Sequence, residues 1–268
     1  MIVPRYNQLR LPLLRRLLGM LYGIERLTVP RVDHVRRRLT PILAGRDGAF
    51  RLADFGCGLA DHLFYYAARH RRAAFVGVDH QETNVLVSRA YQRLLGLDNV
   101  DFVHADLSTL DISLDADVAL CLSVLQYVDN LDDALRGLGR HLTRDGVLVL
   151  YQDVHDSRTR GVTTAIEGAR QYTTAEVSAG LTRTGFTIEQ QACCEGVMAQ
   201  LATGAIRGTL TAMKRNTLVG SALAVPLVLA SPLVLLGLWL DARMAHRSGA
   251  ALLVIARRNA VNSTSGEA

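Results

Sequence analysis

The 268-residue chain has few of the residues that build disulfide frameworks, metal centres or base-stacking surfaces. Its cysteines are only four, Cys57, Cys121, Cys193 and Cys194, and they show neither a disulfide pattern nor metal-ligand spacing. We therefore expect reduced thiols in a cytoplasmic protein and no metal site. Aromatic residues are 6% of the chain, which disfavours a surface that stacks nucleic-acid bases. The N-terminus lacks the apolar run and the small-residue cleavage site of a secretory signal.

One long segment lacks charge altogether. Between Leu218 and Leu240 there is no Asp, Glu, Lys or Arg, and this length suffices to cross a bilayer. Elsewhere 30 Lys and Arg outnumber 25 Asp and Glu, which gives a formal net charge of +5. An excess of positive charge indicates an anionic partner, either lipid headgroups or nucleic acid.

Between residues 50 and 186, short apolar runs alternate with amphipathic stretches. Helical spacing of apolar residues predicts helices at 59–71, 82–96 and 131–142, and a later helix with Thr173 or Thr174 as N-cap and Gly185 at its end. The apolar runs predict strands at 50–55, 73–78, 100–105, 117–124 and 146–153. Strands and helices in this alternation indicate an α/β fold with a doubly wound parallel sheet.

Glycines and carboxylates gather where the first three predicted strands end. The segment "ADFGCGLAD" (residues 53–61) ends the first strand and opens a helix, and its glycines allow backbone to approach a bulky ligand. Asp54, Asp79 and Asp106 each end a successive strand. The carboxyl ends of parallel strands line the ligand crevice of an open sheet. This pattern places Asp79 to bind ribose hydroxyls and Asp106 to receive an exocyclic amine.

The dinucleotide fingerprint of nicotinamide enzymes requires a glycine where this chain has Asp61, so that class is disfavoured. The residues resemble instead the class I S-adenosylmethionine-dependent methyltransferases, in the small-molecule branch that includes quinone methyltransferases. Residues 54–58, Asp-Phe-Gly-Cys-Gly, match the acidic-x-Gly-x-Gly motif of that family. Asp79 matches the ribose-binding carboxylate, and residues 104–107, His-Ala-Asp-Leu, match the adenine segment. Ala60 replaces a frequent third glycine.

The resemblance covers residues 45–194 and resumes at 251–258, and it implies S-adenosylmethionine as cofactor. It also implies a Rossmann-like sheet of seven strands with an antiparallel last strand, and we expect the apolar segment to form a helical insertion before that strand. The residues that we expect to bind the cofactor are Asp54, Gly56, Cys57, Gly58, Asp79, His80, Asp106, Leu107 and Ser123.

Methyl transfer to oxygen also needs a general base near the crevice. The candidates follow the fourth and fifth strands: Tyr127, Asp153 and His155, with His155 preferred. Related quinone enzymes often have histidines where this chain has Gln126-Tyr127, so their pattern does not transfer.

The apolar segment lies between the last two predicted strands, "FTIEQQACC" and "ALLVIARR". Both strands belong to one sheet, so a single membrane crossing would leave the last strand on the wrong side. Pro226 and Pro232 instead predict two short helices that enter the bilayer and return. A lid or a dimer contact is the alternative. Basic residues at both ends of the segment favour the cytoplasmic face.

The N-terminal stretch at 9–27 mixes leucines with arginines, as in an amphipathic helix on a membrane surface. Its alternative is a helix that caps the cofactor site. A basic stretch at 31–41 raises the possibility of nucleic acid, but the Asn/Asp-Pro-Pro-Tyr/Phe motif of nucleic-acid methyltransferases is replaced by "CLSVLQYV". The expected parts are an N-terminal cap at 1–44, a cofactor-binding core at 45–194, an apolar insertion at 195–250, the last strand at 251–258 and a disordered tail at 259–268.

Together these patterns predict an S-adenosylmethionine-dependent methyltransferase bound to the cytoplasmic side of a membrane, in lipid or secondary-metabolite biosynthesis. Its acceptor is expected to be a hydrophobic, lipid-like, phenolic or quinone molecule, methylated on oxygen or on carbon. The alternative is a non-catalytic, cofactor-binding module or partner subunit tethered to the membrane.

Overall fold

The computed structural model describes residues 30–46, 49–107, 110, 113–155, 170–241, 243–244, 246 and 249–259. The chain forms two compact units, of which the larger contains His34–Cys194 and the segment with the last strand. The smaller unit contains Glu195–His246. The amphipathic helix predicted at 9–27 lies outside the described residues, as do residues 260–268 of the predicted tail.

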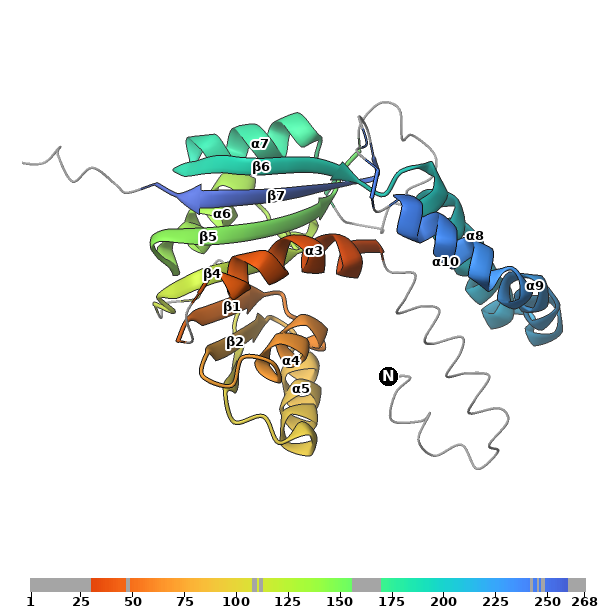
Figure 1. Cartoon of the computed structure of the whole chain (residues 1–268), viewed down its shortest axis with the longest axis horizontal. Helices are drawn as coiled ribbons and strands as arrows, with labels where there is room; N and C mark the ends of the chain where they lie inside the picture. The colour runs from red at the N-terminus through yellow and green to blue at the C-terminus, as the bar shows by residue number, and fades with distance from the viewer. Residues whose placement is uncertain are drawn as a thin grey trace, which may run out of the picture. The chain divides into compact units, whose positions relative to one another are not determined.

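The larger unit is built on one mixed sheet. Its strands are β1 Arg51–Phe55, β2 Ala74–Asp79, β3 Val100–His104, β4 Ala116–Leu122, β5 Leu142–Asp153, β6 Phe186–Cys194 and β7 Ala251–Arg258. Their order across the sheet is β3-β2-β1-β4-β5-β7-β6 (Figure 1). The first five strands pair in parallel, whereas β7 lies antiparallel between β5 and β6. The predicted seven-stranded sheet with an antiparallel last strand is confirmed.

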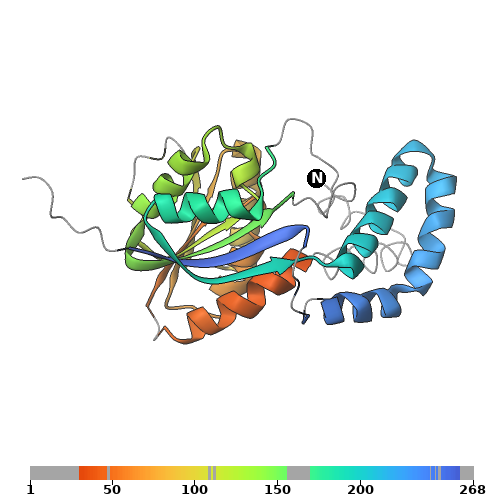
Figure 2. The same cartoon turned by 90° about the horizontal axis from the view of Figure 1, so that it is seen from above.

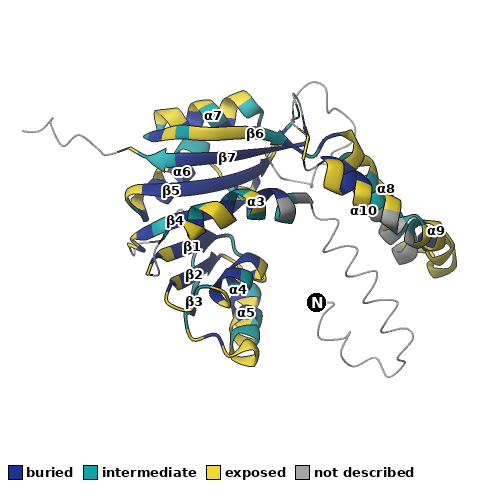
Figure 3. Cartoon of the chain, in the orientation of Figure 1, coloured by how far each residue is buried: buried dark blue, intermediate teal, exposed yellow. Residues whose placement is uncertain are grey.

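Helices cover both faces of this sheet. They are α3 Pro30–Ala44, α4 Asp61–Ala67, α5 Glu82–Leu95, α6 Leu131–Arg140 and α7 Thr174–Arg183, with a 3₁₀ turn, η1, at Leu125–Tyr127. Alternate residues of β5 point to opposite faces, Val147 and Val149 toward α3 and α4, Leu148 and Leu150 toward α6 and α7. Figure 2 shows α3 and α7 on opposite sides of the sheet, and Figure 3 shows the central strands buried.

Local side-chain chemistry sets the helix ends. The Thr173 hydroxyl accepts a hydrogen bond from the Glu176 N–H, and the Glu176 carboxylate accepts one from the Thr173 N–H. This capping box makes Thr173, and not Thr174, the N-cap of α7. The Asn130 side chain caps α6, and Gly96 ends α5 with a left-handed φ of 62°.

Strand β5 begins four residues before the predicted start at residue 146. Leu142 already pairs with Ala116, and the register then shifts before Val147 pairs with Val118. Asp145 has a left-handed φ of 64°, so Asp145-Gly146 forms an irregularity inside the strand and not a turn before it. The apolar run alone does not reveal this, because Thr143 to Asp145 are polar residues that stay in the strand.

The smaller unit contains three consecutive helices, α8 Val197–Arg215, α9 Thr217–Leu229 and α10 Ser231–Asp241. Figure 2 shows the chain reversing after α8 and turning again after α9. The first turn is at Asn216, whose side chain accepts hydrogen bonds from the N–H groups of Leu218 and Val219. Of the two breaks predicted at the prolines, the one near Pro232 is present, because Pro232 is the second residue of α10, whereas Pro226 lies inside α9.

Polar contacts close the two ends of this three-helix segment. The Gly196 N–H donates to the buried Asp241 carboxylate at 3.0 Å, and His246 Nε2 lies 2.7 Å from the Asp241 carbonyl oxygen. Gly196 has no room for a larger side chain, since an added Cβ would lie 2.3 Å from the His246 ring. Among the residues that the structure describes, no helix combines the length and the apolarity that a membrane crossing requires.

Candidate active site

The glycine turn after β1 is packed on one side and open on the other. Gly56 and Cys57 both donate their N–H groups to the Val78 carbonyl of the neighbouring strand, at 2.7 and 3.0 Å. A Cβ on Gly56 would lie 2.4 Å from the Val124 side chain, so this position excludes larger residues. Gly58 has a φ of +55°, and a Cβ there would meet nothing within 4 Å. The open side at Gly58 leaves space for a ligand against the backbone.

Asp79, at the end of β2, holds this turn in place. The residue is 4% exposed, and its carboxylate accepts hydrogen bonds from Gly58 N at 2.8 Å, Gln81 N at 2.9 Å and Asn84 Nδ2 at 3.1 Å. A carboxylate offers about four acceptor positions, so one remains for a ribose hydroxyl. His80 is exposed, with Nδ1 3.9 Å from Asp79 Oδ1. The geometry around Asp79 fits a nucleoside cofactor.

The three predicted carboxylates differ in their surroundings. Asp54 lies in β1, one residue before its end, and is buried. Burial, and then its charge, raise the pKa of the Cys57 and Cys121 thiols far above the usual range. Asp106 is exposed and follows the end of β3 by two residues, whereas Leu107 packs into the core beside α6. Asp79 and Asp106 thus lie at the carboxyl ends of β2 and β3, whereas Asp54 is buried within β1, before the glycine turn.

Ser123, the first residue after β4, also lies at the carboxyl end of its strand. Its φ is +58°, and its N–H donates to the Tyr151 carbonyl of β5 at 2.6 Å. A left-handed conformation is unusual for a residue other than glycine and re-aims the chain where it leaves the strand. The predicted role of Ser123 in cofactor binding stays a prediction.

The predicted general bases lie on three short segments at the ends of β4 and β5. Tyr127, in η1, is 58% exposed, and Asp153 is the exposed last residue of β5. His155 is half-buried, and its N–H donates to the Tyr172 carbonyl at 2.9 Å. Its Nδ1 is shielded from solvent and has no hydrogen-bond partner in the described part of the chain. No contact identifies one of these groups as the base, and the assignment stays a prediction.

Two glutamines that the sequence analysis did not propose as site residues lie at the same ends of the strands. Gln152, in β5, is 1% exposed, and Gln126, in η1, is 6% exposed. Gln152 Nε2 donates to Gln126 Oε1 at 2.7 Å. The sequence does contain a signal, because Gln152 occupies an inward position of the strand, in step with Leu148 and Leu150.

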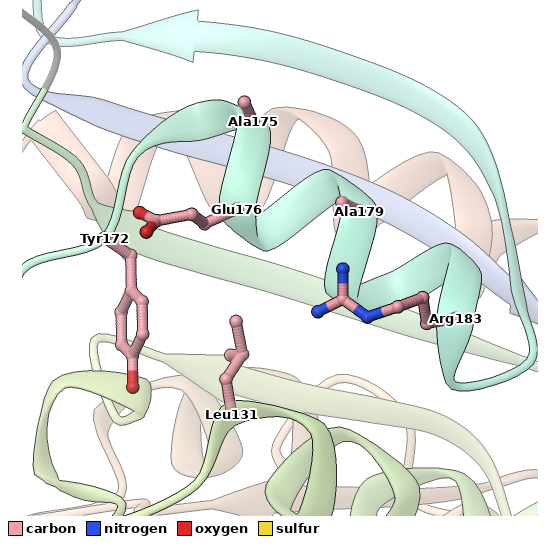
Figure 4. Close-up of a pocket in the computed structure, with 6 residues that line it drawn as sticks. All are labelled: Leu131, Tyr172, Ala175, Glu176, Ala179 and Arg183. Carbon is pink, nitrogen blue, oxygen red and sulfur yellow. The ribbon is translucent and has the colours of Figure 1, made fainter.

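A hollow of about 400 Å³ opens between α6 and α7. Its lining residues are Leu131, Tyr172, Ala175, Glu176, Ala179 and Arg183. Figure 4 shows Glu176 toward one end and Arg183 toward the other. Both charges already have partners, since Glu176 belongs to the α7 capping box and Arg183 donates two hydrogen bonds to Asp132. The hollow therefore offers no free charge to a substrate.

Residues 53–148 match the family model described as a methyltransferase domain. The chain carries an S-adenosylmethionine-dependent methyltransferase domain. The matched range includes the glycine turn, Asp79, Asp106 and Ser123, which lie at the carboxyl ends of the first four strands. The predicted family and its cofactor are thereby confirmed.

Curated relatives of the methyltransferase domain are distant. A malonyl-[acyl-carrier protein] O-methyltransferase of Bacillus cereus is 25% identical over 119 residues, which are 42% of this chain and 43% of that protein. An uncharacterised protein of Rickettsia prowazekii is 27% identical over 100 residues, which are 36% of this chain and 18% of that protein. The chain thus spans less than half the length of these relatives.

Solved structures share the fold of the methyltransferase domain at low identity. The [4+2]-cyclase SpnF has a TM-score of 0.57 and 23% identity, and the match covers 83% of this chain and 80% of that one. Geranyl diphosphate C-methyltransferase from Streptomyces coelicolor, in complex with S-adenosyl-L-homocysteine, has a TM-score of 0.54 and 14% identity, with coverages of 78% and 73%. These similarities concern the fold.

Among the described residues, no group of three or more His, Cys, Asp or Glu is placed to hold a metal ion. None of the four cysteines forms a disulfide with another described residue. The roles assigned to individual cofactor-binding and catalytic residues stay predictions, as do the domain boundaries.

Proposed function

We propose that the protein transfers a methyl group from S-adenosylmethionine to an oxygen atom of a hydrophobic small molecule at the cytoplasmic surface of a membrane. The observation that supports the transfer is the crevice edge, where an open glycine and a nearly saturated Asp79 carboxylate stand side by side. The observation that supports the membrane is the exposed apolar surface of α9 and α10.

On the donor side, Gly58 and Ser123 present backbone to the cofactor, Asp79 accepts from its ribose and Asp106 from its adenine. S-adenosylmethionine, when bound, supplies a methyl group whose transfer breaks the bond to sulfur, forms a bond to the acceptor oxygen and releases the acceptor's proton. The protein's task is to align the acceptor and to accept that proton. His155 is the proposed base, because its Nδ1 has no partner among the described residues, with Asp153 and Tyr127 as the other candidates.

The proposed acceptor is hydrophobic because α9 and α10 expose apolar side chains in numbers unusual for a surface helix. On α9 these are Leu218, Val219, Leu223, Val225 and Leu229. On α10 they are Leu233, Leu236, Trp239 and Leu240. Leu218 is 83% exposed and Leu229 is 77% exposed. A helix that is apolar all round belongs in a core or in lipid.

Two features support lipid as the environment of this surface. Arg215 precedes the charge-free segment, and Arg243 follows it with its guanidinium 3.6 Å from the Trp239 ring centroid. Trp and Arg at the end of an apolar helix are typical of the membrane–water interface. Inserting the Leu229 and Leu233 side chains would contribute about 3–6 kcal/mol of membrane binding.

Vesicle flotation tests the membrane part. The full chain should float with phosphatidylcholine–phosphatidylglycerol vesicles, and the double variant Leu229→Asp/Leu233→Asp should stay in the dense fraction. The matched control is Leu94→Asp/Leu95→Asp on α5, where the two leucines are 78% and 53% exposed. The membrane proposal is wrong if the wild type does not float, or if both double variants float equally.

Labelled methyl donor tests the transfer. Membranes of the producing cell, incubated with purified protein and methyl-labelled S-adenosylmethionine, should yield lipid-extractable label, and the Asp79→Ala variant should yield none. An absence of label with every acceptor fraction, while the cofactor still binds, would refute the enzyme and favour the second candidate. That candidate is a non-catalytic, cofactor-binding module or partner subunit tethered to the membrane.

A further inference from the structure

Two buried glutamines meet at the carboxyl ends of neighbouring parallel strands. Gln152 is the penultimate residue of β5, and Gln126 lies in η1, directly beyond β4. Gln152 follows the alternation of Leu148 and Leu150, whose side chains face α6 and α7. Beyond these strand ends an acceptor would reach the methyl group, since ligands of open α/β sheets bind outside the carboxyl ends of the strands.

The hydrogen bonds of the pair leave one atom without a partner. Gln152 Nε2 donates to Gln126 Oε1 at 2.7 Å and to the Asp153 carbonyl at 3.2 Å, which uses both of its N–H bonds. Gln152 Oε1 is shielded from solvent, and no group in the described part of the chain donates to it. Native proteins contain few such buried, unsatisfied oxygens.

Exchanging the oxygen and nitrogen positions of either amide does not satisfy every polar atom of the pair. If the Gln152 amide were reversed, its oxygen would face the Asp153 carbonyl and Gln126 Oε1, which are both acceptors. Reversing Gln126 as well would leave the Asp153 carbonyl facing an oxygen. The orientation with an open Oε1 is therefore the favoured one, and the missing partner must be a hydrogen-bond donor.

Among the described residues, the neighbours of the pair are apolar or hydrogen-bonded through their backbone, apart from the His155 ring, whose Nδ1 has no partner there. Leu125 and Val154, next to Gln126 and Asp153 in the chain, are buried in the core between the sheet and α6–α7. The Gln126 carbonyl accepts from Arg170 N at 2.9 Å, and the Tyr172 carbonyl accepts from His155 N. Buried apolar neighbours and an open acceptor suit an apolar molecule that has an O–H group.

We propose that the Gln126–Gln152 pair recognises the hydroxyl group of the methyl acceptor, with Gln152 Oε1 accepting a hydrogen bond from it. This inference rests on the proposed function and narrows it, because a hydroxylated acceptor such as a phenol supplies the donor and a fully oxidised quinone does not. Gln152 orients the acceptor oxygen and takes no proton. Gln126 is the positioning residue that keeps the Gln152 amide in this orientation.

The experiment compares two probes that differ in one donor, 4-butylphenol and 4-butylanisole. Their affinities for the full chain are measured by calorimetry with S-adenosylhomocysteine present. The wild type should bind the phenol about tenfold more tightly, the effect of one hydrogen bond to a buried group. Gln152→Leu should bind the two probes alike, and the control Gln190→Leu, at an exposed position of β6, should keep the preference.

A glutamine side-chain spectrum supplies a readout that does not depend on affinity. In ¹⁵N-glutamine-labelled protein, the Nε2 resonances of Gln152 are assigned as those that the Gln152→Leu variant lacks. In the wild type these resonances should shift when the phenol is added and should not shift with the anisole. If Gln152→Leu fails to bind S-adenosylhomocysteine and so has lost its fold, Gln126→Met tests the same prediction by reducing the preference. A wild type without any preference overturns the inference, as does a Gln152→Leu variant that retains it.

The inference and the proposed function fail separately. A phenol preference that depends on Gln152, without labelled product, upholds the recognition site and refutes the methyl transfer. Labelled product without such a preference overturns the recognition site alone.

Discussion

Replacing Gly58 by alanine separates the strain of the glycine turn from its contact with the cofactor. The backbone at Gly58 has a φ of +55°, which costs an alanine about 1–2 kcal/mol of stability. Gly96, at the end of α5, is a matched control, because its φ is +62° and a Cβ there also meets nothing within 4 Å. We expect the two variants to lose the same stability within about 0.5 kcal/mol.

Only Gly58→Ala should lose affinity for the cofactor. Its new methyl group would occupy the open side of the turn, and such overpacking costs about 1–3 kcal/mol, or about fivefold to over a hundredfold in affinity. Urea unfolding measures the stability of each variant, and calorimetry with S-adenosylhomocysteine measures its affinity. If Gly58→Ala binds the cofactor product as tightly as Gly96→Ala, the open side of the turn is not the cofactor site.

Three further predictions follow from the same contacts. Asp79→Asn should lower the free energy of unfolding by about 2–4 kcal/mol, because a carboxamide cannot accept from both Gly58 N and Gln81 N, while the exposed Asp101→Asn changes it little in urea unfolding. Burial and nearby carboxylates raise the pKa of the Cys57 thiol, so the folded chain contains little reactive thiolate. Iodoacetamide labelling of Cys57 at pH 8, followed by mass spectrometry, should be much slower in the folded chain than in urea, and equal rates would contradict this. The Arg183 guanidinium lowers the pKa of Asp132, so the ion pair stabilises the fold at pH values above the usual carboxyl pKa. The wild type should therefore have a higher Tm than Asp132→Asn at neutral pH, and this difference should vanish as pH falls through the lowered pKa. A Tm difference that does not change with pH would refute the prediction.

Much of the sheet was predictable because its strands are buried on both faces. Such strands appear as continuous apolar runs, and β7 occupies the predicted residues 251–258. The glycine turn was equally readable, since Gly56 and Gly58 both have left-handed φ angles that other residues avoid. The exposed Asp106 and the buried Asp54 were predicted alike, because spacing along the chain does not report depth below the sheet edge.

Two features of the helical insertion were not predictable from proline positions. The break at Asn216 depends on a side chain that caps the next helix, and α9 continues through Pro226 without a break. A proline prevents one backbone hydrogen bond but does not prevent a helix whose other contacts hold it. The contact between Gly196, Asp241 and His246 joins residues far apart in the chain, and no local pattern announces it.

The sequence by itself determined the fold class, the strand and helix alternation and the glycine turn after β1, because hydrophobic periodicity and glycine conformation are local properties. Tertiary structure alone decided which polar groups meet at the carboxyl ends of β4 and β5. The Gln126 and Gln152 amides lie 26 residues apart in the chain and bond only because β4 and β5 are neighbours in the sheet. Such pairing depends on strand order and register, which arise from packing of the whole sheet, and so the sequence indicates that Gln152 points inward but not that it meets Gln126.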